Sequence, residues 1–116
     1  MMIINTTPHP INFRNEDGGE FEVKTHCIIN AGVKEKTVKN ENGIEFVKTV
    51  FVPTEEGWEQ IRKIKEEFGN DVIIVGSIIA AQAYPGEIVA MTPAKGFERV
   101  PPAEKRMNPK KFTTFE

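Results

Sequence analysis

The chain has 116 residues, of which 39% are hydrophobic, and its formal net charge is -2. This length and apolar content fit one domain, residues 1–116, with a core of modest size. The single cysteine, Cys27, excludes an internal disulfide framework and fits a reducing compartment.

Membrane, secreted and nucleic-acid-binding classes are also disfavoured. The uncharged run at residues 72–86 is too short and too interrupted by Gly and Pro to span a bilayer. Residues 1–10 lack the basic flank of a secretion signal, so we expect a cytoplasmic protein. The acidic overall charge, without a basic helix or an RNP-like strand, argues against a polymeric nucleic acid as partner.

Charge is unevenly distributed along the chain. Residues 95–112 carry six basic and two acidic side chains, whereas the preceding residues are net acidic. A positive segment on a negative body predicts either an anionic partner or docking on an acidic face of its own or a neighbouring subunit.

The first quarter of the chain predicts short strands. Residues 1–5 form a first strand, which the Thr-Thr-Pro-His-Pro sequence at residues 6–10 ends, because each proline removes a backbone donor. Alternating apolar and polar residues around a turn at 15–19 predict a hairpin over residues 11–24. Residues 25–32 fit either an irregular crossing or another short strand.

A longer hairpin and an amphipathic helix follow. The Asn42-Gly43 pair lies between two alternating runs and predicts a hairpin over residues 33–52. Pro53 ends it, and Thr54 is placed to cap a helix at its N-terminus. Apolar residues then recur at helical spacing as far as Phe68.

The remainder of the chain is organised around residues 71–91, the longest apolar stretch in a densely charged sequence. Its β-branched start is typical of a buried strand, and its alanine-rich centre favours a helix. The stretch predicts a strand, a turn with an N-cap, a short helix, a second turn and a second strand: residues 72–75, Gly76-Ser77, 78–84, Pro85-Gly86 and 88–91.

Residues 92–116 contain prolines that forbid long regular elements, apart from one or two helical turns at residues 102–107. Large apolar side chains in this segment are rare in disordered tails. We therefore expect an ordered C-terminal arm that packs against a surface.

The sequence offers little support for metal or nucleophilic chemistry. His26 and Cys27 are adjacent, so in a strand they point to opposite faces and cannot easily bind one ion together. No nucleophile-elbow motif surrounds Ser77 or Cys27. We expect no metal, no cofactor and no catalytic residue.

Anion binding has two candidate elements. A strand that enters the Gly76-Ser77 turn and opens a helix presents backbone N–H groups to an anion, although a capped, buried helix explains the same residues. In the arm, Phe97, Arg99, Arg106 and Phe112 combine aromatic rings with guanidinium groups, and Asn108 could contact a base edge. The alternative is that the rings anchor the core and the arginines form surface pairs.

Three segments resemble a known family: MIINTTPHPINF, VIIVGSIIAAQAYPGEIVAM and GFERVPPAEKRMNPKKFTTF. They are similar to a group of small phage and prophage proteins that begin with a strand and a Thr-Pro-His turn, and within it to the Thoeris anti-defence proteins of the first type. The resemblance covers both ends and the centre, but not the hairpin or the amphipathic helix.

The resemblance implies a sponge in the cytoplasm of the infected bacterial host, which sequesters a cyclic ADP-ribose-type signal without cleaving it. It also implies a homo-oligomer, a dimer or a dimer-based assembly, with pockets between paired subunits. It assigns to Arg106 a contact with phosphate or base. An aromatic or wall residue is expected near Ile78-Ile79 in relatives, and aliphatic residues there leave stacking to Phe97 or Phe112.

We therefore expect an α+β protein: an antiparallel β-sheet from the first half, one amphipathic helix, a short second helix and an extended C-terminal arm. The leading hypothesis is binding of a small anionic cyclic nucleotide. The alternatives are a nucleotide-cleaving phage enzyme and a phage structural or adaptor protein. The expected ligand-binding residues are Gly76, Ser77, Phe97, Arg99, Arg106, Met107, Asn108 and Phe112.

Overall fold

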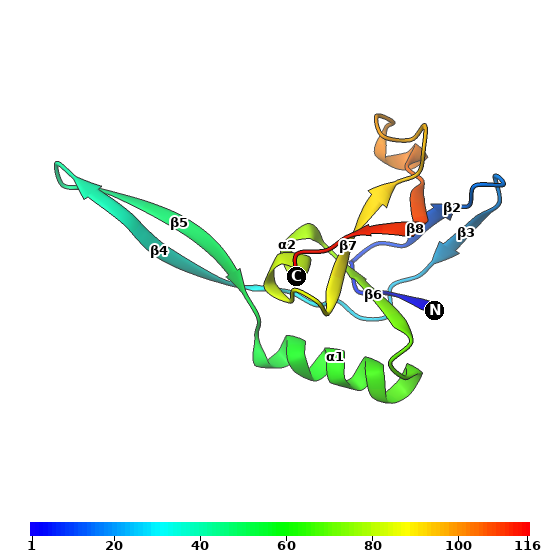
Figure 1. Ribbon diagram of the computed structural model, residues 1–116, viewed down its shortest axis with the longest axis horizontal. Helices are drawn as coiled ribbons and strands as arrows, with labels where there is room; N and C mark the ends of the chain where they lie inside the picture. The colour runs from blue at the N-terminus through cyan, green and yellow to red at the C-terminus, as the bar shows by residue number, and fades with distance from the viewer.

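Six short strands form one sheet in the computed structural model, which describes residues 1–116 (Figure 1). The strand order is β1-β6-β7-β8-β2-β3. The bounds are β1 Met2–Asn5, β2 Ile11–Arg14, β3 Glu20–Val23, β6 Val72–Gly76, β7 Ile88–Pro93 and β8 Met107–Thr113.

The two edges of this sheet meet. Asn5, at the end of β1, bridges to Thr25 just after β3, and the backbone N–H of His26 donates to the carbonyl of Asn5 over 2.8 Å. The Nδ2 group of Asn5 also donates to the carbonyl of Val23 over 3.0 Å. The sheet therefore curls into a partly closed barrel.

The expected α+β class is confirmed, but the strand pairing differs from the expected antiparallel sheet of the first half. Strand β1 pairs parallel with β6, β6 with β7, and β8 with β2. Only β2–β3 and β7–β8 are antiparallel within this sheet. Apolar alternation indicates which face of a strand is buried and does not indicate its neighbour, so these long-range pairs were missed.

Apolar residues fill both faces of the curled sheet. Inside the barrel, Ile11, Phe13 and Val75 form one buried cluster. Outside it, Ile74 packs in a second cluster with Ile61 and Ile64 of helix α1 (Glu55–Phe68). Because successive strand residues point to opposite faces, Ile74 and Val75 belong to different clusters.

Both predicted helices are present. The Oγ1 of Thr54 accepts from the backbone N–H of Gly57 and caps α1, as predicted. The Oγ of Ser77 accepts from the N–H of Ala80 over 3.0 Å and caps α2 (Ile78–Ala83). The two caps explain why each helix begins where it does.

The predicted hairpin at residues 33–52 is also present, as β4 (Gly32–Glu41) and β5 (Ile44–Val52). These strands pair only with one another and project from the body as a ribbon (Figure 1). Asn42 and Gly43 have φ values of 52° and 77°, the left-handed backbone that a two-residue hairpin turn requires.

The C-terminal arm is ordered, as expected, but part of it belongs to the sheet. After a 3-10 turn at Pro102–Glu104, β8 lies between β7 and β2. Its register with β7 shifts between Met91 and Pro93, and Pro109 lies between its two paired ends. This irregularity accommodates a proline within a strand, which the sequence prediction did not anticipate.

Candidate functional site

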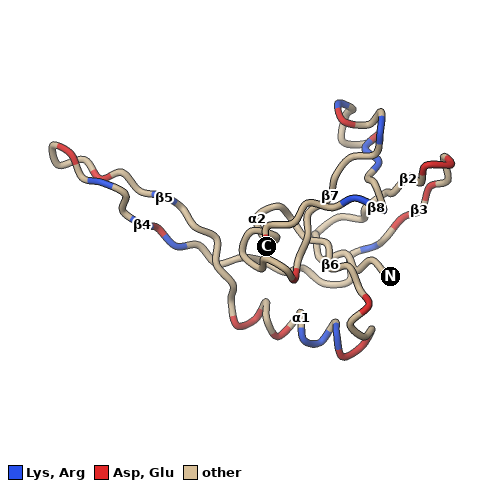
Figure 2. Tube along the Cα trace, in the orientation of Figure 1, with Lys and Arg blue, Asp and Glu red and all other residues tan.

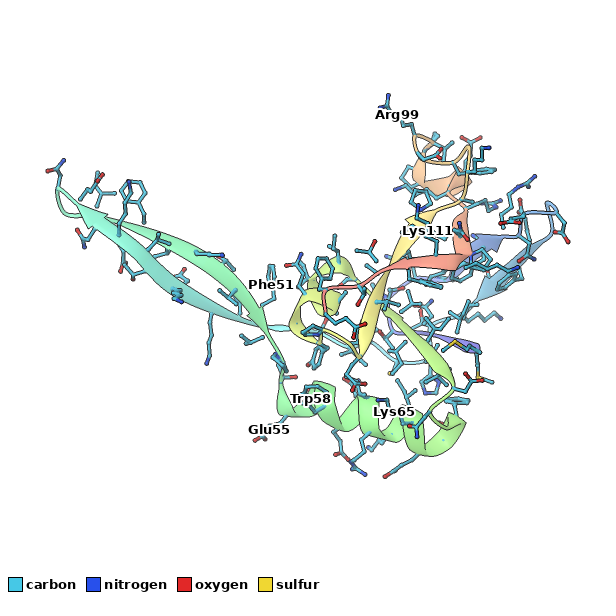
Figure 3. All side chains as sticks on the ribbon, in the orientation of Figure 1. Phe51, Glu55, Trp58, Lys65, Arg99 and Lys111 are labelled. Atoms are coloured by element: carbon cyan, nitrogen blue, oxygen red, sulfur yellow. The ribbon has the colours of Figure 1, made fainter.

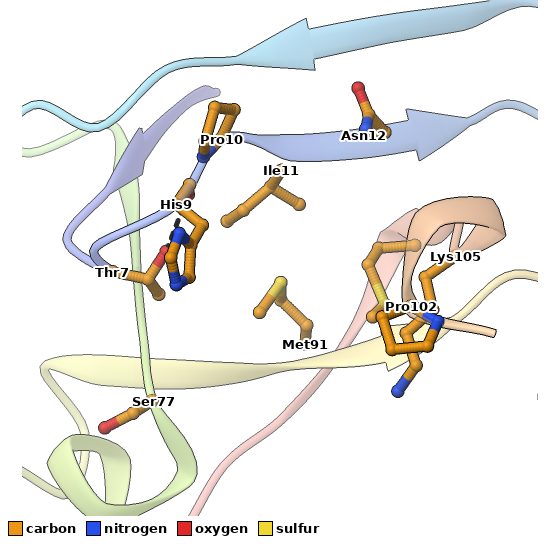
Figure 4. Close-up of a pocket in the computed structure, with 10 residues that line it drawn as sticks. Thr7, His9, Pro10, Ile11, Asn12, Ser77, Met91, Pro102 and Lys105 are labelled. Carbon is orange, nitrogen blue, oxygen red and sulfur yellow. Dashed lines mark hydrogen bonds between the residues drawn. The ribbon is translucent and has the colours of Figure 1, made fainter.

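A cavity of about 320 Å³ lies at one end of the barrel (Figure 4). At this end β1, β6 and β7 finish and β2 and β8 begin. The mouth of a barrel and the carboxyl ends of parallel strands are common positions for ligand sites. The lining residues are Thr7, His9, Pro10, Ile11, Asn12, Ser77, Met91, Pro102, Lys105 and Met107.

The cavity has an apolar base and a polar rim. Ile11, Met91 and Met107 all belong to the cluster inside the barrel. Figure 4 shows Ile11 and Met91 between His9 and Lys105, which come from opposite sides of the mouth. An apolar surface beside a cationic side chain suits a planar group that carries negative charge.

The loop that carries His9 is held by the buried side chain of Asn5. Asn5 Nδ2 donates to the carbonyl of His9 over 2.8 Å, and Asn5 Oδ1 accepts from the N–H and Oγ1 of Thr7 over 2.8 and 2.7 Å. The Oγ1 of Thr25 donates to the carbonyl of Thr7 over 2.8 Å. Because Asn5 is fully buried and every polar atom of its side chain is paired, the backbone of this loop is fixed at the cavity wall.

The Gly76-Ser77 turn has a mainly structural environment. Gly76 is buried, and a Cβ there would approach Ile88 Cγ2 to 2.7 Å, so the position requires glycine for close packing. Ser77 lies on the cavity rim, while its hydroxyl caps α2. The interpretation of this turn as a helix cap is therefore supported, and Ser77 adds to it a position beside the cavity.

Arg106 lies in an ion-pair cluster outside the cavity lining. Its Nε donates to Glu20 Oε1 over 2.8 Å, and Arg14 donates to Glu20 Oε2 over 2.7 Å. These hydrogen bonds, first from Arg106 and then from Arg14, hold the pKa of Glu20 below its ordinary value. The guanidinium of Arg14 also lies over the ring of Phe97, 5.4 Å from its centroid.

This cluster bears on the two interpretations of the basic segment. Figure 2 shows the basic residues between β7 and β8 near the acidic turn that joins β2 to β3. Arg106 makes its contact with Glu20 across this gap. Docking on an acidic part of its own chain therefore accounts for one of the six basic residues.

The other expected site residues are dispersed. Arg99 is exposed and points away from the body (Figure 3). Phe112 packs in the barrel beside Phe13, with ring centroids 6.4 Å apart. Asn108 lines a separate open groove of about 640 Å³ with Arg14 and Lys95. Of the expected site residues, only Ser77 and Met107 line the barrel-mouth cavity.

Sequence reasoning missed Thr7, His9 and Lys105 as cavity residues. The Thr-Thr-Pro-His-Pro sequence was interpreted as a strand break and as part of the family resemblance, and not as part of a ligand site. An asparagine before two threonines could have indicated a loop organised by side-chain hydrogen bonds. Lys105 had no signal beyond its place in the basic segment.

The described chain brings no three His, Cys, Asp or Glu side chains together as a group that could hold a metal ion. No helix has the length and apolar character needed to cross a membrane. Comparison with protein-family models, with curated proteins and with solved structures finds no match.

Proposed function

We propose that the protein binds a small anionic nucleotide at the barrel mouth and holds it without cleavage. The observation that carries this proposal is the juxtaposition of an apolar base, formed by Ile11 and Met91, with the polar rim of His9, Ser77 and Lys105. A base or ribose would lie on the apolar part, and Lys105 would meet a phosphate.

The resemblance supports a more specific ligand, a cyclic ADP-ribose-type immune signal, and a role as a phage anti-defence protein that sequesters it in the host cytoplasm. A volume of about 320 Å³ is near the lower end for ligand pockets, so one mouth would enclose part of such a ligand. A second copy of the chain would cover the rest, in agreement with a homo-oligomeric assembly.

Binding is favoured over cleavage by the composition of the cavity. The ten lining residues include no carboxylate and no cysteine, and the Ser77 hydroxyl is engaged as a helix cap. Cleavage by a side chain needs an activated nucleophile or a paired acid and base. His9 is the only imidazole in the lining, and no carboxylate lies beside it there to form a paired acid and base.

Calorimetric titration with cyclic ADP-ribose isomers of different linkage tests the proposal. We expect saturable heat with at least one isomer, and about tenfold weaker binding for Lys105→Ala, because a charge-assisted hydrogen bond is lost. Lys111→Ala is the matched control, since Lys111 is exposed on β8 and does not line the cavity.

The ligand recovered from the denatured complex separates the alternatives. Intact nucleotide supports sequestration, whereas a cleaved product indicates the nucleotide-cleaving enzyme. The absence of both heat and a thermal shift with every isomer would leave the structural or adaptor hypothesis in its place.

A further inference from the structure

The β4–β5 ribbon is a two-stranded sheet, and many of its apolar side chains are exposed because no helix or second sheet packs on them. Val38 and Ile44 are 65% and 59% exposed, and Phe46, Val47 and Val50 are exposed as well. The ribbon contributes to a longest molecular dimension of 58 Å (Figure 1). A two-stranded ribbon alone is marginally stable in water, so its length and composition indicate an additional partner.

The two free edges of the ribbon differ. Strand β4 carries Lys34, Lys36 and Lys39, and its register shifts between Thr37 and Lys39. Lysines and bulges are features that prevent an edge strand from pairing with another chain. The edge of β4 is therefore protected.

Strand β5 lacks this protection. Its sequence, IEFVKTVFV, has one acidic and one basic residue, Glu45 and Lys48, and no proline or glycine. Apolar side chains occur on both of its faces, since Phe46 and Val47 are adjacent. A long edge strand of this kind readily accepts a further strand.

We infer that β5 pairs antiparallel with β5 of a second copy of this chain, so that two ribbons form a four-stranded sheet. A two-fold axis lets the same edge serve as donor and acceptor on both chains. The side chains of β5 carry no net charge, so two copies can approach, whereas β4 has three lysines against Glu35 and Glu41. Pairing between two β4 strands would bring like charges together.

The direction in which the ribbon projects also favours pairing with a second copy over coverage by another part of the same chain. The ribbon extends away from the barrel and α1, so another body can approach its end (Figure 1). The inferred contact concerns assembly alone and does not depend on the nucleotide proposed above. A failure of either proposal can therefore be recognised separately.

Sedimentation equilibrium of the full chain tests this contact. Without nucleotide, we expect wild type to have twice the chain mass of 13.1 kDa. Two double variants, Val47→Lys/Val50→Lys and Val47→Glu/Val50→Glu, should each raise the dimer dissociation constant at least about tenfold through like-charge repulsion. An equimolar mixture of the two should restore a dimer, because opposite charges then face one another.

The matched control is Val33→Lys/Val38→Lys on β4, which should remain dimeric. Hydrogen exchange of the unaltered chain provides a second readout that needs no substitution: β5 amides should gain protection as protein concentration rises, and β4 amides should not. A monomeric wild type, a mixture that stays monomeric, or loss of the dimer only in the β4 variant would overturn the inference.

Discussion

The Nε of Arg106 donates to Glu20 Oε1 over 2.8 Å and joins the segment before β8 to the first residue of β3. Arg14 binds the other oxygen of the same carboxylate. Arg106, which the family resemblance assigns to ligand contact, is therefore engaged within its own chain. A ligand that takes Arg106 must compete with Glu20.

The Glu20 cluster predicts a pH-dependent effect on stability. Because the pKa of Glu20 is lowered in the folded protein, its ionised form contributes stability above the ordinary value of 4.5, and this contribution is lost as pH falls further. Glu20→Gln should therefore lower the free energy of unfolding at pH 7 and match wild type in strong acid. Urea unfolding across this pH range measures the difference, and Glu22→Gln, which removes the same charge from the same strand but leaves the Glu20 cluster intact, is the control.

The hydrogen bonds of Asn5 predict that replacing this residue lowers the free energy of unfolding substantially. Asn5→Ala removes the bonds that Asn5 makes to the carbonyl of Val23 and to the N–H of Thr7, while the Thr7 hydroxyl and the His9 carbonyl keep their bond to one another. We expect a loss of about 3 kcal/mol in the free energy of unfolding, since buried polar groups without partners cost roughly 1–3 kcal/mol each. Asn12→Ala, at an exposed position on β2, should change it by less than about 0.5 kcal/mol. Equal effects of the two substitutions in chemical denaturation would contradict this account of the loop.

Replacing Gly57 with alanine should change the stability in the direction opposite to that usual for a glycine in a helix. Glycine to alanine within a helix ordinarily stabilises by about 0.5–1 kcal/mol. At position 57, however, the new Cβ would overlap the hydroxyl of Tyr84, which accepts a hydrogen bond from the N–H of Thr54. Gly57→Ala should therefore destabilise by about 1–3 kcal/mol, and thermal unfolding should show a lower Tm. The exposed Lys63→Ala on the same helix serves as the control, and an unchanged or raised Tm for Gly57→Ala would show that the packing is looser.

Cys27 should react slowly with thiol reagents. Burial raises its pKa above the ordinary value of 9.0, so less thiolate is present at neutral pH. Alkylation by iodoacetamide should be slower in the folded chain than in the same chain in urea. Equal rates in both conditions would mean that the thiol is accessible and not shifted.

The parts of the fold that were predicted depend on neighbouring residues. Thr54 and Ser77 were identified as caps because a hydroxyl three residues before the N–H it caps is a local pattern, and Asn42-Gly43 was identified as a hairpin turn for a similar reason. The pairing of Ile3 with Ile73, by contrast, joins distant segments. No local pattern encodes such a pair.

The candidate site was predicted only in part for the same reason. Ser77 and Met107 were predicted as site residues, and both line the cavity. Its rim also includes His9 and Lys105, which lie 96 positions apart in the sequence and were not predicted. Phe112 was chosen as a stacking group, and the structure places it in the barrel core. Aromatic residues serve both purposes, so composition alone could not distinguish the two roles.

Amide chemical shifts of the ¹⁵N-labelled chain, recorded during titration with cyclic ADP-ribose isomers, test the location of binding most directly. We expect saturable shifts at Thr7, His9, Ser77 and Lys105, which surround the barrel mouth. Shifts confined to the separate groove at Arg14, Lys95 and Asn108, or no shift with any isomer, would contradict it.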